Sequence, residues 1–329
     1  MALELLSSYN MWPELLAEGY EEGRSKASNL KLEETPRSII VCGLGGSGVV
    51  GDFLRALSIV YGFKVPVNVI KDYRLQPWVE ESLIVTVSYS GETLETLKCF
   101  KEAVERGAKI AVITSGGRLE YEASKIGAPI VKARAGLLPR VALPSMLGGL
   151  IGLTDSIGAS SVDHERVLEA YHELRNVTVD EAEPYASLVS ESDITIIGAC
   201  GPHSIVAERW RQELSENSKI LAKTELYPES AHNDIVAWQT KKNIRTAFIA
   251  VKGGDRVCEA IMNYVTEIYK RHGETLELKL GQLSLASMLK GALIAGYASA
   301  IAATTRGVDP AATPLIAGYK KMLGENLKL

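Results

Sequence analysis

Two stretches of this sequence decide its fold: I-I-V-C-G-L-G-G-S-G-V-V-G-D at residues 39–52 and L-I-V-T-V-S-Y-S-G-E-T-L-E-T at residues 83–96. Each begins with a short β-branched apolar run, turns through small residues and enters a helical pattern. A strand–loop–helix junction of this kind leaves backbone N–H groups unpaired at the start of the helix. Those groups and the positive end of the helix dipole favour a bound phosphate.

The first stretch contains a glycine pattern that two kinds of site use. Gly43, Gly45 and Gly48 fit G-x-G-x-x-G, which by itself is weak evidence for a dinucleotide site. Asp72 follows the next predicted strand, where an acid could bind a ribose. A nicotinamide-dependent dehydrogenase is therefore one alternative. The loop lacks the lysine of a P-loop, which argues against a Walker A nucleotide site.

The second stretch favours a phosphate monoester instead. Ser88, Ser90 and Thr93 place three hydroxyl groups around Gly91, and a dinucleotide fold has no use for them. Hydroxyl donors and backbone amides can bind a phosphate without any lysine. Ordinary turn and N-cap residues are the alternative explanation for such hydroxyls. Two such loops at the same end of a parallel sheet make that explanation weaker.

These motifs are similar to those of a known family. G-G-S-G after a first strand and S-x-S-G-x-T after a third resemble a sugar isomerase (SIS) domain, which binds phosphosugars. The rest of the chain resembles the archaeal bifunctional phosphoglucose/phosphomannose isomerases nearly end to end. The segments that carry this resemblance are L-P-R-V-A-L-P (138–144), E-N-S-K-I (216–220), Y-P-E-S-A-H-N (227–233) and V-D-P-A-A-T-P with Y-K-K (308–321).

The pattern of strands and helices predicts an α/β protein in two halves, each a parallel sheet flanked by helices. The resemblance implies that each half is an SIS-type subdomain. We expect an N-terminal subdomain at residues 1–158 with the phosphate-binding loops, and a C-terminal subdomain at residues 159–329 with the catalytic base. Predicted strands of the first half are 38–42, 65–70, 83–87, 109–114 and 129–132, and its predicted helices are 49–61, 93–106, 119–126 and 143–157.

The second half repeats the strand–turn–helix pattern in a degenerate form. Predicted strands are 194–199, 245–251 and 276–280, and predicted helices are 205–216, 256–271 and 285–304, with a linking helix before them and a C-terminal helix at 312–323. Because the second copy lacks the hydroxyl-rich loop, we expect one phosphate site per chain.

The resemblance implies an aldose–ketose isomerase acting on glucose 6-phosphate and mannose 6-phosphate to give fructose 6-phosphate, through a cis-enediol and without metal or other cofactor. It assigns proton transfer between C1 and C2 to Glu216, ring opening to His232 with Lys320, and stabilisation of the enediolate to Arg140. It also implies that Thr313 helps the enzyme accept both C2 epimers, by holding a water near the C1–C2 bond. The implied phosphate-binding residues are Gly46, Ser47, Ser88, Ser90 and Thr93.

Each of these residues also has an ordinary structural explanation when the family is set aside. Glu216 and Lys320 could be solvated helix residues, His232 a loop residue and Arg140 a salt-bridge partner. Thr313 before a proline is a common helix start. Two positions depart from the family: Ala231 stands where a second histidine is frequent, and Glu92 where asparagine is frequent. A carboxylate at position 92 would be unfavourable beside a phosphate unless it points away.

Composition excludes several other classes. A net charge of −4 provides no electrostatic basis for binding nucleic acid or an anionic membrane. The apolar stretch 292–303 is short and rich in Ala and Gly, which argues against a membrane span. The other histidines show no metal-ligand spacing. We expect four reduced thiols, no secretory signal, a cytoplasmic location and a homodimer, the last from the resemblance alone. A non-catalytic phosphosugar-sensing SIS module remains a further alternative.

Overall fold

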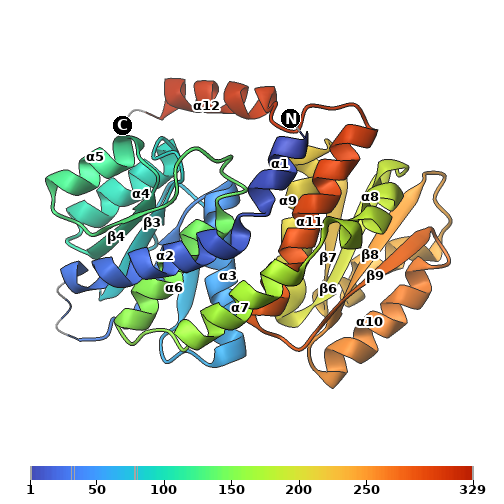
Figure 1. Ribbon diagram of the computed structural model, residues 1–329, viewed down its shortest axis with the longest axis horizontal. Coiled ribbons are helices and arrows are strands. Elements are labelled where there is room, and N and C mark those ends of the chain that lie inside the picture. Colours follow the sequence, from blue (N-terminus) through green and yellow to red (C-terminus); the bar gives the residue numbers. More distant parts are fainter. Residues whose placement is uncertain (1, 31, 33, 78, 80, 328–329) are drawn as a thin grey trace. The chain divides into compact units, whose positions relative to one another are not determined.

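The computed structural model of this protein describes residues 2–30, 32, 34–77, 79 and 81–327. The chain forms two compact units, each built around one parallel sheet (Figure 1). The first-sheet unit comprises Met11–Tyr171 and Thr313–Leu329, and the second-sheet unit comprises Met1–Asn10 and His172–Ala312. Our predicted division after residue 158 stays a prediction about domains. The units differ from it in residues 1–10, 159–171 and 313–329.

The first sheet has five parallel strands in the order β2-β1-β3-β4-β5. They are β1 (Ser38–Cys42), β2 (Val67–Ile70), β3 (Ser82–Val87), β4 (Lys109–Thr114) and β5 (Ile130–Lys132). Its helices are α2 (Trp12–Ala27), α3 (Gly45–Tyr61), α4 (Leu94–Glu105), α5 (Gly117–Lys125), α6 (Leu143–Ser156) and α12 (Pro314–Asn326), with the short η1 (Ser28–Leu30). All five predicted strands of the first half are confirmed within two residues.

Helices cover both faces of this sheet. Ile40, Ile84 and Val112 pack with apolar side chains of α4 and α5 in one buried cluster. On the opposite face, Gly51 of α3 lies directly against Val41. Near-continuous burial along β1, β3 and β4 explains why these strands read as unbroken apolar runs in the sequence.

The second sheet has four parallel strands in the order β7-β6-β8-β9. They are β6 (Ile194–Cys200), β7 (Ala222–Tyr227), β8 (Thr246–Gly253) and β9 (Glu274–Gly281). Its helices are α1 (Ala2–Tyr9), α8 (Glu183–Ser190), α9 (Ser204–Asn217), α10 (Arg256–Tyr269) and α11 (Leu285–Thr305), with η2 (Val179–Ala182), η3 (Gly201–His203), η4 (Glu229–His232) and η5 (Asp234–Gln239). Helix α7 (His164–Asn176) contributes residues to both units. We did not predict β7.

Helix α11 contains the apolar stretch 292–303, which we expected to be too short for a membrane span. It spans 21 residues and is long and apolar enough to cross a membrane by length and composition alone. In this protein 83% of its apolar window is buried inside the fold, as in a core helix. The apolar segment is therefore longer than we predicted.

The expectation of four reduced thiols is wrong. Cys200 at the end of β6 and Cys258 in the first turn of α10 form a disulfide. Cys42 and Cys99 are free and buried. Sequence spacing could not reveal the bridge, because the two cysteines stand 58 residues apart and meet only when β6 pairs with β8.

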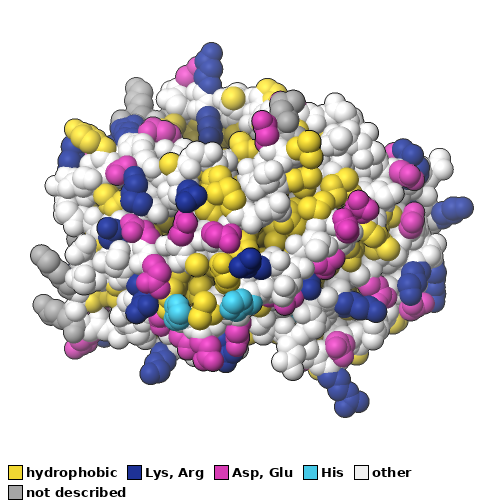
Figure 2. Space-filling view, in the orientation of Figure 1, with side chains coloured by type: hydrophobic (Ala, Val, Ile, Leu, Met, Phe, Trp, Pro, Cys, Tyr) yellow, Lys and Arg dark blue, Asp and Glu magenta, His cyan; other side chains and the backbone are white. Residues whose placement is uncertain are grey.

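Charges of both signs are interspersed on the face drawn in Figure 2, without an extended field of one sign. This agrees with the small net charge of −4.

Helices α2 and α6 pack closely enough for their backbones to meet. A Cβ atom on Gly152 of α6 would lie 2.0 Å from the carbonyl oxygen of Tyr20, and one on Gly23 of α2 would lie 2.1 Å from that of Gly149. Distances this short leave no room for any side chain, so the glycines set how closely the two helices approach.

We therefore predict that Gly152→Ala lowers the free energy of unfolding by about 1–3 kcal/mol through overpacking. Urea denaturation followed by circular dichroism measures this. The matched control is Gly318→Ala in α12, where a Cβ meets nothing within 4 Å. It should be neutral or stabilising by up to about 1 kcal/mol, because alanine is the better helix former. Equal stability of the two variants would contradict the close α2–α6 packing.

Candidate active site

The two loops singled out in the sequence lie at one edge of the first sheet. Strands β1 and β3 are parallel neighbours, with Ile39 paired to Leu83 and Cys42 to Thr86. Their carboxyl ends therefore deliver loop 43–48 and loop 88–93 to the same place. In open parallel sheets ligands bind at this edge, beside the strand where the order reverses.

Helix α3 begins at Gly45, four residues before our predicted start, so Gly46 and Ser47 belong to its first turn. The chain enters the helix through Gly45 at a φ of +54°, a conformation that favours glycine. The first-turn amides of α3 consequently lie at the edge of the sheet. This is the local arrangement that suits an anion.

Loop 88–93 is held in shape by its own hydroxyls. The Oγ of Ser88, which is buried, donates to Thr93 Oγ1 at 3.0 Å, and Ser90 Oγ accepts from the Glu92 amide at 3.2 Å. Gly91 has a φ of +70°, and a Cβ there would lie 1.9 Å from the carbonyl oxygen of Gly116. The loop thus packs backbone to backbone against the loop that follows β4.

Tyr89 connects the two loops, and our sequence reasoning missed it. Its amide donates to Ser47 Oγ at 3.0 Å. Its phenol donates to the Arg134 carbonyl at 2.9 Å and accepts from the Leu137 amide at 2.8 Å. Burial raises the pKa of the Tyr89 phenol, which keeps it protonated. The only sequence signal was an aromatic residue between two serines of the loop.

Arg140 follows the segment that Tyr89 anchors and is 3% exposed. A Cβ on Gly46 would lie 3.3 Å from the Pro139 carbonyl oxygen and 3.5 Å from Arg140 Cα. The first-sheet unit therefore brings both loops and the Arg140 backbone together. Of the predicted substrate-binding residues, Gly46 and Ser47 lie in the first turn of α3, Ser88, Ser90 and Thr93 lie in the second loop, and Thr313 immediately precedes α12.

The carboxylate of Glu92 is directed to a helix start. Its Oε1 accepts from the Arg118 amide at 2.7 Å, in the first turn of α5. A carboxylate is favourable at the N-terminus of a helix. This contact explains how the loop accommodates a glutamate at position 92.

Lys320 and Thr313 lie on α12. Thr313 is the N-cap residue of this helix, and the Lys320 side chain is exposed. The helix contacts α4 near the second loop: Tyr319 Oη donates to Glu95 Oε1 at 2.8 Å, and Glu95 itself is buried. This hydrogen bond attaches an otherwise exposed helix to the first turn of α4.

Glu216 and His232 belong to the second-sheet unit. Glu216 is the penultimate residue of α9 and is partly exposed. Lys219, at a φ of +56°, donates its Nζ to the Glu216 carbonyl oxygen at 2.5 Å. The backbone at the end of α9 is thus tied down by a lysine of the same E-N-S-K motif.

His232 ends η4 and is exposed. Its loop is attached to β7 by polar contacts. Glu225, which is 1% exposed, accepts hydrogen bonds from Trp238 Nε1 at 3.1 Å and Tyr227 Oη at 2.8 Å, and Lys223 Nζ lies 2.6 Å from Asp234 Oδ1. These bonds anchor the chain on both sides of the histidine.

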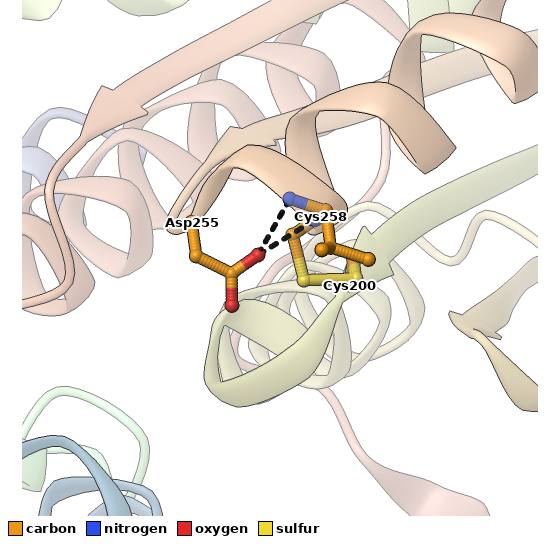
Figure 3. Close-up of a disulfide and its surroundings, with 4 residues drawn as sticks. Cys200, Asp255 and Cys258 are labelled. Atoms are coloured by element: carbon orange, nitrogen blue, oxygen red, sulfur yellow. Dashed lines mark hydrogen bonds between the residues drawn. A yellow bond between two sulfur atoms is a disulfide. The ribbon is translucent and has the colours of Figure 1, made fainter.

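The corresponding edge of the second sheet is closed differently. Asp255 caps α10 by accepting from the amides of Val257 at 2.9 Å and Cys258 at 2.8 Å (Figure 3). The Cys200–Cys258 disulfide joins this turn to the end of β6. An internal carboxylate therefore occupies these helix-start amides.

In the part of the chain that the structure describes, no group of three or more His, Cys, Asp or Glu side chains has a geometry that could hold a metal ion. The donors at the edge of the first sheet are instead hydroxyl and amide groups. Such donors bind phosphate oxygens by hydrogen bonds.

Comparison with known proteins agrees with this geometry. Residues 178–323 match the model of the bacterial phospho-glucose isomerase C-terminal SIS domain, and residues 33–122 match the SIS domain. The chain is 19% identical to the C-terminal domain of glucosamine-fructose-6-phosphate aminotransferase from Francisella tularensis, with a TM-score of 0.73 over 93% of this chain and 97% of that one. At this identity the likeness supports the fold alone.

Sequence relatives are closer. The chain is 34% identical to the bifunctional phosphoglucose/phosphomannose isomerase of Aeropyrum pernix over 97% of this chain and 98% of that protein. It is 31% identical to the enzyme of the same name from Caldicellulosiruptor bescii, with the same coverage. Likeness at this level over nearly the whole length establishes the family, and it confirms the resemblance carried by the motifs: the chain belongs to the bifunctional phosphoglucose/phosphomannose isomerases of the SIS superfamily.

Proposed function

We propose that this isomerase interconverts glucose 6-phosphate and mannose 6-phosphate with fructose 6-phosphate by proton transfer through a cis-enediol. The observation that carries the proposal is the pair of hydroxyl-lined loops at the edge of the first sheet, joined by the Tyr89–Ser47 hydrogen bond. In the proposal the hydroxyls of Ser47, Ser88, Ser90 and Thr93 and the amide at Gly46 bind the phosphate.

The chemistry is assigned to four side chains. His232, assisted by Lys320, moves the proton that opens the sugar ring. Glu216 takes the proton from C2 of the open-chain aldose as the C1–C2 enediolate forms, and returns it to C1 as the O2 hydroxyl proton passes to O1 and the C2 carbonyl forms. Arg140 stabilises the negative charge that develops on the enediolate oxygen.

Acceptance of both epimers is assigned to Thr313. Glucose 6-phosphate and mannose 6-phosphate differ only in configuration at C2, so both lead to the same enediol. A water held by the Thr313 hydroxyl near C1 and C2 would let the chain bind either configuration. Thr313 stands at the N-cap position of α12, without a capping hydrogen bond from its side chain.

The proposal includes a homodimer in the cytoplasm. The cytoplasm is the expected compartment because charged sugar phosphates do not cross a bilayer unaided. Light scattering of the purified protein tests the dimer.

The first test is a coupled assay of fructose 6-phosphate formation from glucose 6-phosphate and, separately, from mannose 6-phosphate, with EDTA present. We expect turnover of both sugars, because the assigned residues carry the proton transfer without a metal. Turnover of glucose 6-phosphate alone would remove the role of Thr313. Turnover of neither would favour a phosphosugar-sensing module.

The phosphate loops are tested by Ser88→Ala. We predict that KM rises about 10- to 100-fold with kcat little changed, because one hydrogen bond to a charged phosphate is lost. The matched control is Ser82→Ala, a buried serine at the opposite end of β3 whose Oγ bonds Ser38 Oγ at 2.7 Å. A fall in kcat alone for Ser88→Ala would place the phosphate elsewhere.

The base is tested by Glu216→Gln. We predict a loss of kcat of at least about 100-fold with substrate affinity retained, because the amide keeps the shape but cannot accept the proton. Stopped-time assays measure kcat, and calorimetry with an unreactive hexitol 6-phosphate measures affinity. Glu259→Gln, at an exposed glutamate of α10, controls for the change in charge. Near-normal turnover in Glu216→Gln would refute the assignment.

A further inference from the structure

A buried polar cluster lies in the second-sheet unit, at the junction of three helices. It consists of side chains from α1, α9 and α11, each at most 1% exposed: Tyr9, Arg209, Glu213, Asn217 and Ser299. Charged and polar groups are rarely buried this completely unless they are paired. None of them has a role in the reaction as we propose it.

Glu213 is the centre of this cluster. Arg209, one turn earlier on α9, forms an ion pair with Glu213 Oε1. Glu213 Oε2 accepts from Tyr9 Oη at 2.6 Å and from Asn217 Nδ2 at 2.8 Å. Burial and the neighbouring carboxylate raise the pKa of Tyr9 well above its usual value, so the phenol keeps its proton and donates.

Asn217 extends the cluster to α11. Its Nδ2 lies 2.8 Å from Ser299 Oγ and 3.1 Å from Tyr9 Oη, and the Ser299 hydroxyl donates to the Gly296 carbonyl at 2.9 Å. The last turn of α9 is therefore bonded through side chains to two other helices.

The Tyr9 ring packs against the backbone of α11 at Gly296. A Cβ on Gly296 would lie 2.6 Å from the ring, so glycine permits the ring to lie against the α11 backbone. The adjacent residue is also anchored, because Tyr297 Oη donates to Asn10 Oδ1 at 2.7 Å. These contacts explain why residues 1–10 belong to the second-sheet unit.

Stability alone is a weak explanation for such a cluster. Well-packed apolar side chains of similar volume are often as stabilising as a buried ion pair, or more so. A buried hydrogen-bonded network, by contrast, restricts its members to one arrangement. What it restricts here is the helix end that carries Glu216, the residue immediately before Asn217.

We infer that Tyr9, Glu213 and Asn217 are positioning residues that hold the C-terminal turn of α9, and with it Glu216, in the geometry needed for proton transfer. The inference rests on the proposed function, because it takes Glu216 as the base. A catalytic group displaced by about 1 Å can lose on the order of 100-fold in rate, so a network of this kind affects kcat more than binding.

The test is Tyr9→Phe, which removes one hydroxyl and leaves the ring on Gly296. We expect kcat to fall about tenfold with KM within about twofold of wild type. We also expect faster hydrogen–deuterium exchange of backbone amides at residues 214–220, measured by mass spectrometry. The exchange measurement does not depend on activity, so it reports on the helix end directly.

The matched control is Tyr20→Phe. Tyr20 is 1% exposed, and its Oη donates to Asp155 Oδ2 at 2.6 Å, the same donor, acceptor type and distance as the Tyr9–Glu213 bond. It links α2 to the last turn of α6 within the first-sheet unit, and neither Tyr20 nor Asp155 is assigned a role in the reaction. This variant should lose comparable stability and keep wild-type kcat and wild-type exchange at residues 214–220.

Two outcomes would overturn the inference: wild-type kcat in Tyr9→Phe, or equal losses of kcat in Tyr9→Phe and Tyr20→Phe. If Tyr9→Phe fails to fold, Ser299→Ala decides, since it removes one acceptor of Asn217 and should show the same split between kcat and KM. Near-normal turnover of Glu216→Gln would refute the base assignment instead. The exchange at residues 214–220 would then still show whether the network holds the end of α9.

Discussion

The parallel pairing of β1 with β3 is the constraint on which the first-sheet unit depends. It places two loops that are far apart in sequence at one edge of the sheet, where the Tyr89 amide can bond Ser47 Oγ. The phenol of the same tyrosine bonds residues 134 and 137, so Tyr89 also fixes the position of the segment that leads to Arg140. Gly91 lets loop 88–93 lie directly against the loop that follows β4, since any Cβ at this position would clash with the Gly116 carbonyl.

The second-sheet unit is also built on a parallel sheet, but its strand ends are occupied differently. Its strand ends carry no hydroxyl-rich loop, and the start of α10 is capped by Asp255 and bridged to β6 by a disulfide. Buried carboxylates do the anchoring: Glu213 at the end of α9 and Glu225 beside the His232 loop. The first-sheet unit thus presents hydroxyl and amide donors at its strand ends, and the second-sheet unit anchors the end of α9 and the loop of His232 through buried carboxylates.

Most strands and helices of the fold could be predicted from the sequence. Unbroken apolar runs marked β1, β3 and β4, because burial on both faces of a parallel sheet leaves no polar positions. Strand β7 escaped prediction because its inward residues are Glu225 and Tyr227, whose burial depends on Trp238 and Tyr269 from other elements. The start of α3 was misplaced because glycines at its first turn do not read as helix.

The sequence by itself determined the fold class, the order of most strands and helices, the two loops and the family. These depend on local periodicity and on short motifs, which neighbouring residues specify. Only the tertiary structure decided that Glu92 caps α5, that Tyr89 joins the loops, that Cys200 bonds Cys258, and that Tyr9 reaches α9. Each of these is a contact between residues far apart in the chain, whose partners no local pattern identifies.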